Sequence, residues 1–169
     1  SLRLQGLNAS ATIGMTVRAR ELREAGKDVI NLSLGVPDFD TPEFIKSAGV
    51  EAINQNYTQY SPVAGFLDLK EAICLKLKRD NGLNYSPGQI VVSGGVKHAL
   101  ANLAISILNP EDEVIILAPY WISYFEIVKI AGARPILVHA SAENNFQHAI
   151  EDIRNAITDK TRMFWFSTP

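Results

Sequence analysis

Residues 93–97 read Ser-Gly-Gly-Val-Lys and combine two glycines with a cation where an apolar run gives way to a helical pattern. Glycines let the backbone approach a ligand closely, and the first N–H groups of a helix can bind an anion. A lysine in the first helical turn opposes the helix dipole unless an anion lies near it. The pattern fits a phosphate-binding turn, and it fits equally well a tight strand-to-helix turn with a solvated lysine. It is neither a Walker A loop nor a GxGxxG fingerprint.

Three aromatic residues, Tyr120, Trp121 and Tyr124, follow a second apolar run that stops at Pro119. A flat side chain at the carboxyl end of a strand can stack on a planar cofactor ring. The alternative is that Trp121 packs the next helix against the sheet, and the local pattern alone favours this packing role.

A second aromatic group lies in the polar, turn-rich stretch 57–65, which contains Tyr57 and Tyr60. A tyrosine phenol can hydrogen-bond an anion. The alternative, which the stretch alone favours, is that these rings cover the edge of a core.

Other reactive side chains offer weaker signals. The three histidines, His98, His139 and His148, show neither metal-ligand spacing nor a partner nucleophile, and His98 is expected on a helix face. The single cysteine, Cys74, excludes an internal disulfide and a cysteine-based zinc site. Residues 111–113 (Glu-Asp-Glu) are expected to form a solvated loop. We therefore expect no metal site.

The elements that must position these groups alternate between helical and strand patterns. Helices are expected over residues 12–26, 42–55, 67–81, 97–108, 122–131 and 147–157, the second of them with Thr41 as its N-cap. Strands are expected over 89–93, 113–117, 134–138 and 162–166, and a short strand or extended segment is expected over 28–34. Continuous apolar strands separated by helices predict an α/β fold, with a mostly parallel sheet between helical layers. Ligands of such sheets bind at the carboxyl ends of the strands.

Composition limits the function classes. The 169 residues are 47% hydrophobic and carry 16 basic against 18 acidic side chains, so the net charge is −2. This balance excludes a strongly basic nucleic-acid binder. No apolar run approaches the roughly 20 residues of a membrane span, and the first ten residues lack the apolar core of a signal peptide. We therefore expect a cytoplasmic protein without nucleic-acid or membrane partners.

The most apolar expected strand, residues 162–166, stands three residues before the end of the sequence. A buried strand with nothing after it is an unusual terminus, so we expect the chain to be a fragment of a longer protein.

Taken in order, five motifs resemble the N-terminal part of fold type I pyridoxal 5'-phosphate (PLP) aminotransferases, and most closely the aspartate aminotransferase-like group. They are Ser10-Ala11-Thr12 and the stretches 35–42, 60–65, 94–100 and 119–124. The resemblance implies a three-layer αβα large domain, here incomplete. It places an N-terminal arm and small-domain segment in residues 1–45 and the first part of the PLP-binding domain in residues 46–169.

The resemblance also implies roles for residues toward PLP. Gly95, Val96 and Lys97 match the turn that holds the cofactor phosphate at a helix N-terminus. Trp121 matches the aromatic residue that stacks on the pyridine ring and also touches substrate.

Two further matches concern substrate and assembly. Gly35 matches the position whose backbone meets the substrate carboxylate. Tyr60 matches a tyrosine that reaches the cofactor phosphate of the neighbouring subunit, which implies a homodimer with composite sites.

The implied activity is transamination between an L-amino acid and a 2-oxo acid, with aspartate and 2-oxoglutarate as the expected pair. The family's Schiff-base lysine and its other decisive groups match positions beyond Pro169. We therefore assign no catalytic residue in this chain and expect the chain alone to be inactive. Asn8 stands where relatives that also act on prephenate carry a lysine, which weakens a prephenate assignment.

Two alternatives stay open. A PLP-dependent carbon–sulfur lyase shares the fold and many of the motifs, although the context of Trp121 and Ser123 favours the aminotransferase. The other alternative is a non-catalytic α/β module that binds a phosphorylated ligand.

Overall fold

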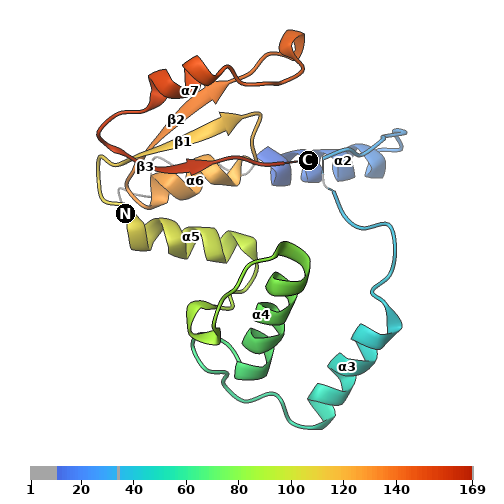
Figure 1. The fold of residues 1–169 in the computed structure, drawn as a ribbon. Helices are drawn as coiled ribbons and strands as arrows, with labels where there is room; N and C mark the ends of the chain where they lie inside the picture. The colour runs from blue at the N-terminus through green and yellow to red at the C-terminus, as the bar shows by residue number, and fades with distance from the viewer. Residues whose placement is uncertain (1–10, 34, 169) are drawn as a thin grey trace. The chain divides into compact units, whose positions relative to one another are not determined.

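The computed structural model describes residues 11–33 and 35–168 (Figure 1). These residues form two compact units, which we call the helical unit (residues 15–93) and the sheet unit (mainly residues 94–168). The helical unit holds most of α2 (Ala11–Glu24), with α3 (Glu43–Asn54), α4 (Leu67–Asn81) and the 3-10 turn η1 (Pro87–Gln89). The sheet unit holds, in order, α5 (Val96–Ile107), β1 (Glu113–Ala118), α6 (Ser123–Ile130), β2 (Arg134–His139), η2 (Ala142–Asn144), α7 (Ile150–Ala156) and β3 (Thr161–Trp165).

The three strands form a parallel sheet in the order β2-β1-β3. Ile116 in the central strand lies opposite Leu137 of β2 and Trp165 of β3. Parallel pairing brings the carboxyl ends of all three strands to one edge, and this confirms the predicted α/β class with a parallel sheet.

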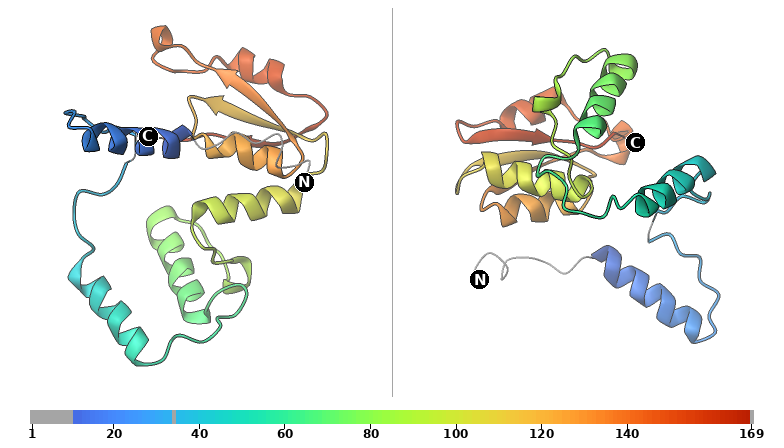
Figure 2. Two further views of the ribbon diagram at one scale, coloured as in Figure 1. Left: turned by 180° about the vertical axis from the view of Figure 1, so that it is seen from behind. Right: turned by 90° about the horizontal axis from the view of Figure 1, so that it is seen from below.

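The hydrophobic core lies in the sheet unit. All fully buried side chains of the described residues fall between Ala104 and Trp165, and β1 contributes Val114, Ile115 and Ile116. Helices α5 and α6 pack on the Val114–Ile116 face through Ala104, Leu108, Ile127 and Val128. Helix α7 lies on the other side of the sheet (Figures 1 and 2). Because β1 has neighbours on both sides and helices above and below, its sequence is apolar from Val114 to Ala118.

The predicted strand over 89–93 is wrong, and residues 28–33, predicted as a strand or an extended segment, form no strand. Residues 28–33 run extended without strand pairing, and the Val29 carbonyl accepts a hydrogen bond from the Arg23 guanidinium instead (3.0 Å); Leu34 lies outside the described residues. In the stretch 89–93, Gln89 ends η1 and the Val92 N–H donates to the Ala64 carbonyl (3.0 Å). An apolar extended run becomes a strand only where a neighbouring backbone completes its ladder, and none among the described residues does so here.

Helix ends agree with the sequence at glycines but not at Thr41. Helix α3 begins at Glu43, and Pro42 is the N-cap because its carbonyl accepts the first helical bonds, from Ile45 and Lys46 (3.0 and 3.2 Å). The predicted Thr41 cap is therefore one residue too early. Gly82 and Gly132 follow α4 and α6 with φ angles of 68° and 86°, which glycine adopts without strain.

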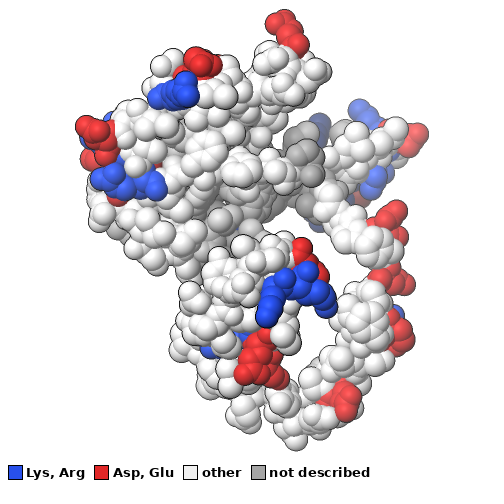
Figure 3. Space-filling model, in the orientation of Figure 1, with Lys and Arg blue, Asp and Glu red and all other residues white. Residues whose placement is uncertain are grey.

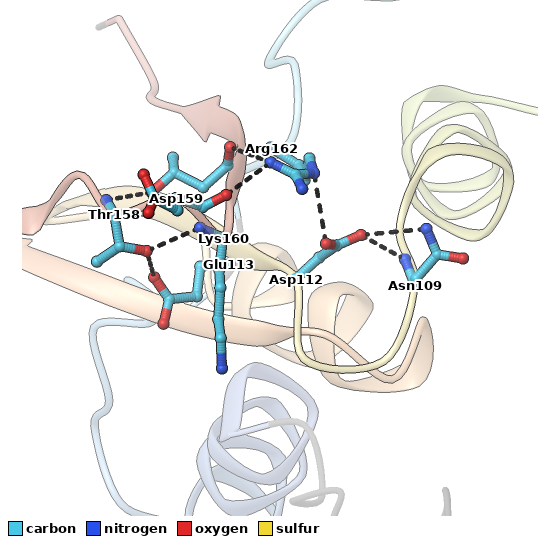
Figure 4. A network of polar contacts seen from close by, with 8 residues as sticks. Asn109, Asp112, Glu113, Thr158, Asp159, Lys160 and Arg162 are labelled. Atoms are coloured by element: carbon cyan, nitrogen blue, oxygen red, sulfur yellow. Dashed lines mark hydrogen bonds and ion pairs between the residues drawn. The ribbon is translucent and has the colours of Figure 1, made fainter.

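A polar network ties the amino ends of the strands together, on the edge opposite the expected site (Figure 4). The Asp112 carboxylate accepts from the Asn109 N–H (2.7 Å) and pairs with Arg162 (3.4 Å). The Glu113 carboxylate accepts from the Thr158 hydroxyl (2.6 Å). Asp112 and Glu113 are only 9% and 7% exposed, so the predicted solvated loop is wrong for these two residues.

Replacing Asp112 by alanine should lower the free energy of unfolding of the full-length protein by about 2 kcal/mol, because the Asn109 N–H loses its bond to a charged, largely buried acceptor. Glu111→Ala is the matched control. Its side chain is 71% exposed and its pairs with Arg134 and Lys160 are 3.9 and 4.0 Å long, so the loss should stay within about 0.5 kcal/mol. Chemical denaturation measures both, and equal losses would contradict the structural role of Asp112.

Charged side chains of both signs are interspersed on the face drawn in Figure 3. Among the described residues, no helix is long and apolar enough to cross a bilayer.

Candidate functional site

The turn before α5 has a backbone that only glycine adopts readily. Gly95 is the N-cap, with φ 91° and ψ 167°, and its carbonyl accepts from the Ala99 N–H (3.1 Å). A Cβ built on Gly95 meets no described atom within 4 Å, so the surroundings are open and the φ angle alone demands glycine.

This turn presents free hydrogen-bond donors. Within residues 11–33 and 35–168, no acceptor meets the backbone N–H groups of Gly95, Val96 or Lys97. Free N–H groups at a helix N-terminus, together with the positive end of the helix dipole, attract an anion. The turn therefore has the donors that a phosphate group requires.

His98 has a partner that the sequence interpretation missed. Its Nδ1 accepts a hydrogen bond from the Gly94 N–H at 3.0 Å. The signal was its spacing, because His98 is the third residue after the N-cap, where a side chain can reach back over the start of the helix.

Trp121 both packs and remains accessible. Its ring meets Tyr124 edge to face at 5.6 Å between centroids, and Tyr124 contacts Trp165 in the same way at 5.4 Å. Trp121 keeps 39% of its surface exposed, and the Lys97 ammonium lies 5.2 Å from its ring centroid. The structure thus brings the α5 turn and the aromatic segment after β1 together.

A hollow lies at the carboxyl ends of β1 and β3. It has a volume of about 510 Å³ and is lined by Leu117, Pro119, Asn145, Phe146, His148, Phe166, Ser167 and Thr168. The His148 Nε2 lies 3.0 Å from the Ala118 carbonyl and must donate to it, because a carbonyl oxygen only accepts. This hydrogen bond from His148, just before α7, fixes the end of β1, from which the chain continues to Trp121.

Gly35 and Tyr60 belong to the helical unit, where both are exposed. Tyr57 packs on Phe66 at 5.7 Å between centroids, as a ring that covers an edge would. The loop that carries Tyr60 ends at Gly65, where a Cβ would lie 2.6 Å from Val92. Glycine there allows the loop to lie directly against Val92. The predicted roles of Gly35 and Tyr60 stay predictions, and Asn8 and Ser10 lie outside the described residues.

The described residues hold no group of three His, Cys, Asp or Glu side chains close enough to share a metal ion. The site of the sheet unit brings together three N–H donors, an ammonium group and an accessible indole ring. This set suits a phosphate ester on a flat aromatic ring, with the phosphate at the turn and the ring near Trp121.

The chain is similar to known proteins in sequence and in fold. The family model for aminotransferase class I and II matches residues 27–169. An aspartate aminotransferase of Bacillus subtilis is 46% identical over 99% of this chain, and a probable aspartate/prephenate aminotransferase of Rhizobium leguminosarum is 48% identical over 98%. The structure of Thermus thermophilus aspartate aminotransferase with maleate superposes with a TM-score of 0.92 and 44% identity, over 97% of this chain.

The chain spans only 42–43% of the length of these relatives. The match to the Bacillus subtilis protein nevertheless covers 99% of this chain, and the family model covers residues 27–169. The chain belongs to the aminotransferase class I and II family.

Proposed function

We propose that the protein containing this chain is a PLP-dependent aminotransferase that exchanges an amino group between L-aspartate and 2-oxoglutarate. The observation that carries the proposal is the turn at Gly95–Lys97 in a chain of this family. Its three N–H groups have no acceptor among the described residues, and its Lys97 ammonium lies 5.2 Å from the centroid of the accessible Trp121 ring. A phosphate group and a flat ring are the two parts of PLP that a protein must hold.

In this proposal the turn anchors the cofactor. The N–H groups of Gly95, Val96 and Lys97 donate to the phosphate oxygens, and the α5 dipole favours the negative charge. Trp121 covers one face of the ring and excludes water from it. When bound, PLP supplies an electron sink that stabilises negative charge at the substrate Cα. The residues of this chain bind and orient the cofactor and carry no proton transfer.

Gly35 and Tyr60 complete the proposal on the substrate side. The Gly35 N–H would donate to the substrate carboxylate. Tyr60, whose side chain is exposed, would donate its hydroxyl proton to the cofactor phosphate of a second subunit. A two-fold dimer would place each Tyr60 in the partner's site. Residues 1–45 would then form the arm and small-domain segment, and residues 46–169 the first part of the large domain.

The test begins with the full-length gene. We expect the reading frame to continue past the Pro169 codon, and we expect the purified product to form glutamate and oxaloacetate from aspartate and 2-oxoglutarate. Product analysis also separates the alternatives. A carbon–sulfur lyase would release pyruvate from a cysteine-derived substrate without forming glutamate. A binding module would retain PLP and form neither product.

A further inference from the structure

We propose that His98 is a positioning residue of the anion-binding turn. Its Nδ1 holds the Gly94 N–H and thereby sets the Gly94–Gly95 backbone in the orientation that presents the next three N–H groups to a phosphate. The inference rests on the proposed function and adds a residue to its cofactor site.

The backbone N–H groups of the turn are of two kinds, those that have an acceptor and those that have none among the described residues. The Gly94 N–H is engaged by the imidazole, whereas the N–H groups of Gly95, Val96 and Lys97 have no acceptor among the described residues. His98 therefore binds the Gly94 N–H, which directly precedes the three N–H groups that have no acceptor among the described residues. His98 fixes the turn without competing with the anion.

The fit between His98 and Gly94 is close. A Cβ built on Gly94 would lie 3.4 Å from the His98 Nδ1, so glycine leaves the space that the ring occupies. An Nδ1 that accepts carries no proton, and the neutral ring then holds its proton on Nε2. The contact thus selects one tautomer of the ring.

Two consecutive glycines make this turn mobile unless something holds it. Gly94 and Gly95 have no side chains to restrict their backbone, and glycine loses more conformational freedom on ordering than other residues. If His98 did not hold the turn, the anion would have to order it on binding. Pre-organisation by His98 therefore predicts tighter binding of the phosphate group.

Asparagine and leucine provide a matched test at this position. The Asn Oδ1 stands as many bonds from Cα as the His Nδ1 and can accept from Gly94, whereas leucine has the shape of asparagine without an acceptor. His98 is exposed, so neither change should prevent folding, and a thermal melt of each apoprotein checks this.

The readout is the equilibrium affinity of full-length apoprotein for PLP and for pyridoxal, followed by absorbance. We expect His98→Leu to weaken PLP binding about tenfold and His98→Asn to stay within about threefold of wild type, since an acceptor is what differs. Pyridoxal, which lacks the phosphate, should bind all three proteins alike. His139→Leu, at the end of β2, controls for loss of a histidine and should change neither affinity.

Equal PLP affinities of His98→Leu and wild type would overturn the inference, as would a similar weakening for pyridoxal. If His98→Leu fails to fold, His98→Ala takes its place with the same expected values. Wild-type protein that binds no PLP would overturn the proposed function itself, and the two failures are thereby distinguished.

Discussion

Replacing Gly95 by alanine should lower the affinity of the full-length apoprotein for PLP about 100-fold, with the fold retained. At φ 91° and ψ 167° an alanine is strained by about 1–3 kcal/mol, so the turn would relax to another conformation when no ligand is bound. Binding would have to restore the strained form or proceed with misdirected N–H groups. Either route removes most of the phosphate's contribution to the free energy of PLP binding. Titration of the apoprotein with PLP measures this loss of affinity.

Gly132 provides the matched control for this prediction. It also has a positive φ angle (86°), and a Cβ built there likewise meets no described atom within 4 Å. It lies between α6 and β2, away from the α5 turn. Gly132→Ala should therefore lower the melting temperature without changing PLP affinity. If both variants lost PLP affinity equally, general destabilisation would explain the loss and the assigned role of Gly95 would be wrong.

The fold could be predicted from sequence where local pattern and partner agree. The apolar runs that became β1, β2 and β3 each found a parallel neighbour in the sheet unit, so their prediction is confirmed. The runs at 28–33 and 89–93 also contain apolar residues, but no strand pairs with them among the described residues. Sequence alone shows which segments favour an extended backbone, and the pairing depends on what lies beside them.

The site shows the same division between local and non-local information. The turn at Gly95–Lys97 was predictable because glycine freedom and helix N-termini are local properties. The approach of Lys97 to Trp121 joins residues 24 positions apart and required the fold. His98 was predicted as a plain helix-face residue, because its place three residues after the N-cap permits a hydrogen bond back to the turn but does not require one.

The isolated 169-residue chain should show no measurable transamination and no single cooperative melt as a monomer. No described residue of the helical unit is fully buried, and large apolar side chains in it, including Ile30 and Leu32, are almost wholly exposed. Within the described residues β3 pairs only with β1, which leaves the other edge of β3 open beside exposed Phe164 and Phe166. Both units thus present surfaces that a native protein covers.

Circular dichroism with sedimentation, and an assay of glutamate formation, would test this on the isolated chain beside the full-length protein. Adding the remainder of the protein as a separate chain should restore part of the activity, because the apolar faces and the β3 edge would regain their cover. Turnover by the isolated chain would contradict the assignment of no catalytic residue to it, whereas a cooperative monomeric melt without turnover would contradict only the folding argument. Folding and chemistry are therefore tested separately, since the proposed phosphate-binding turn lies in the sheet unit and the proposal assigns catalysis to groups outside this chain.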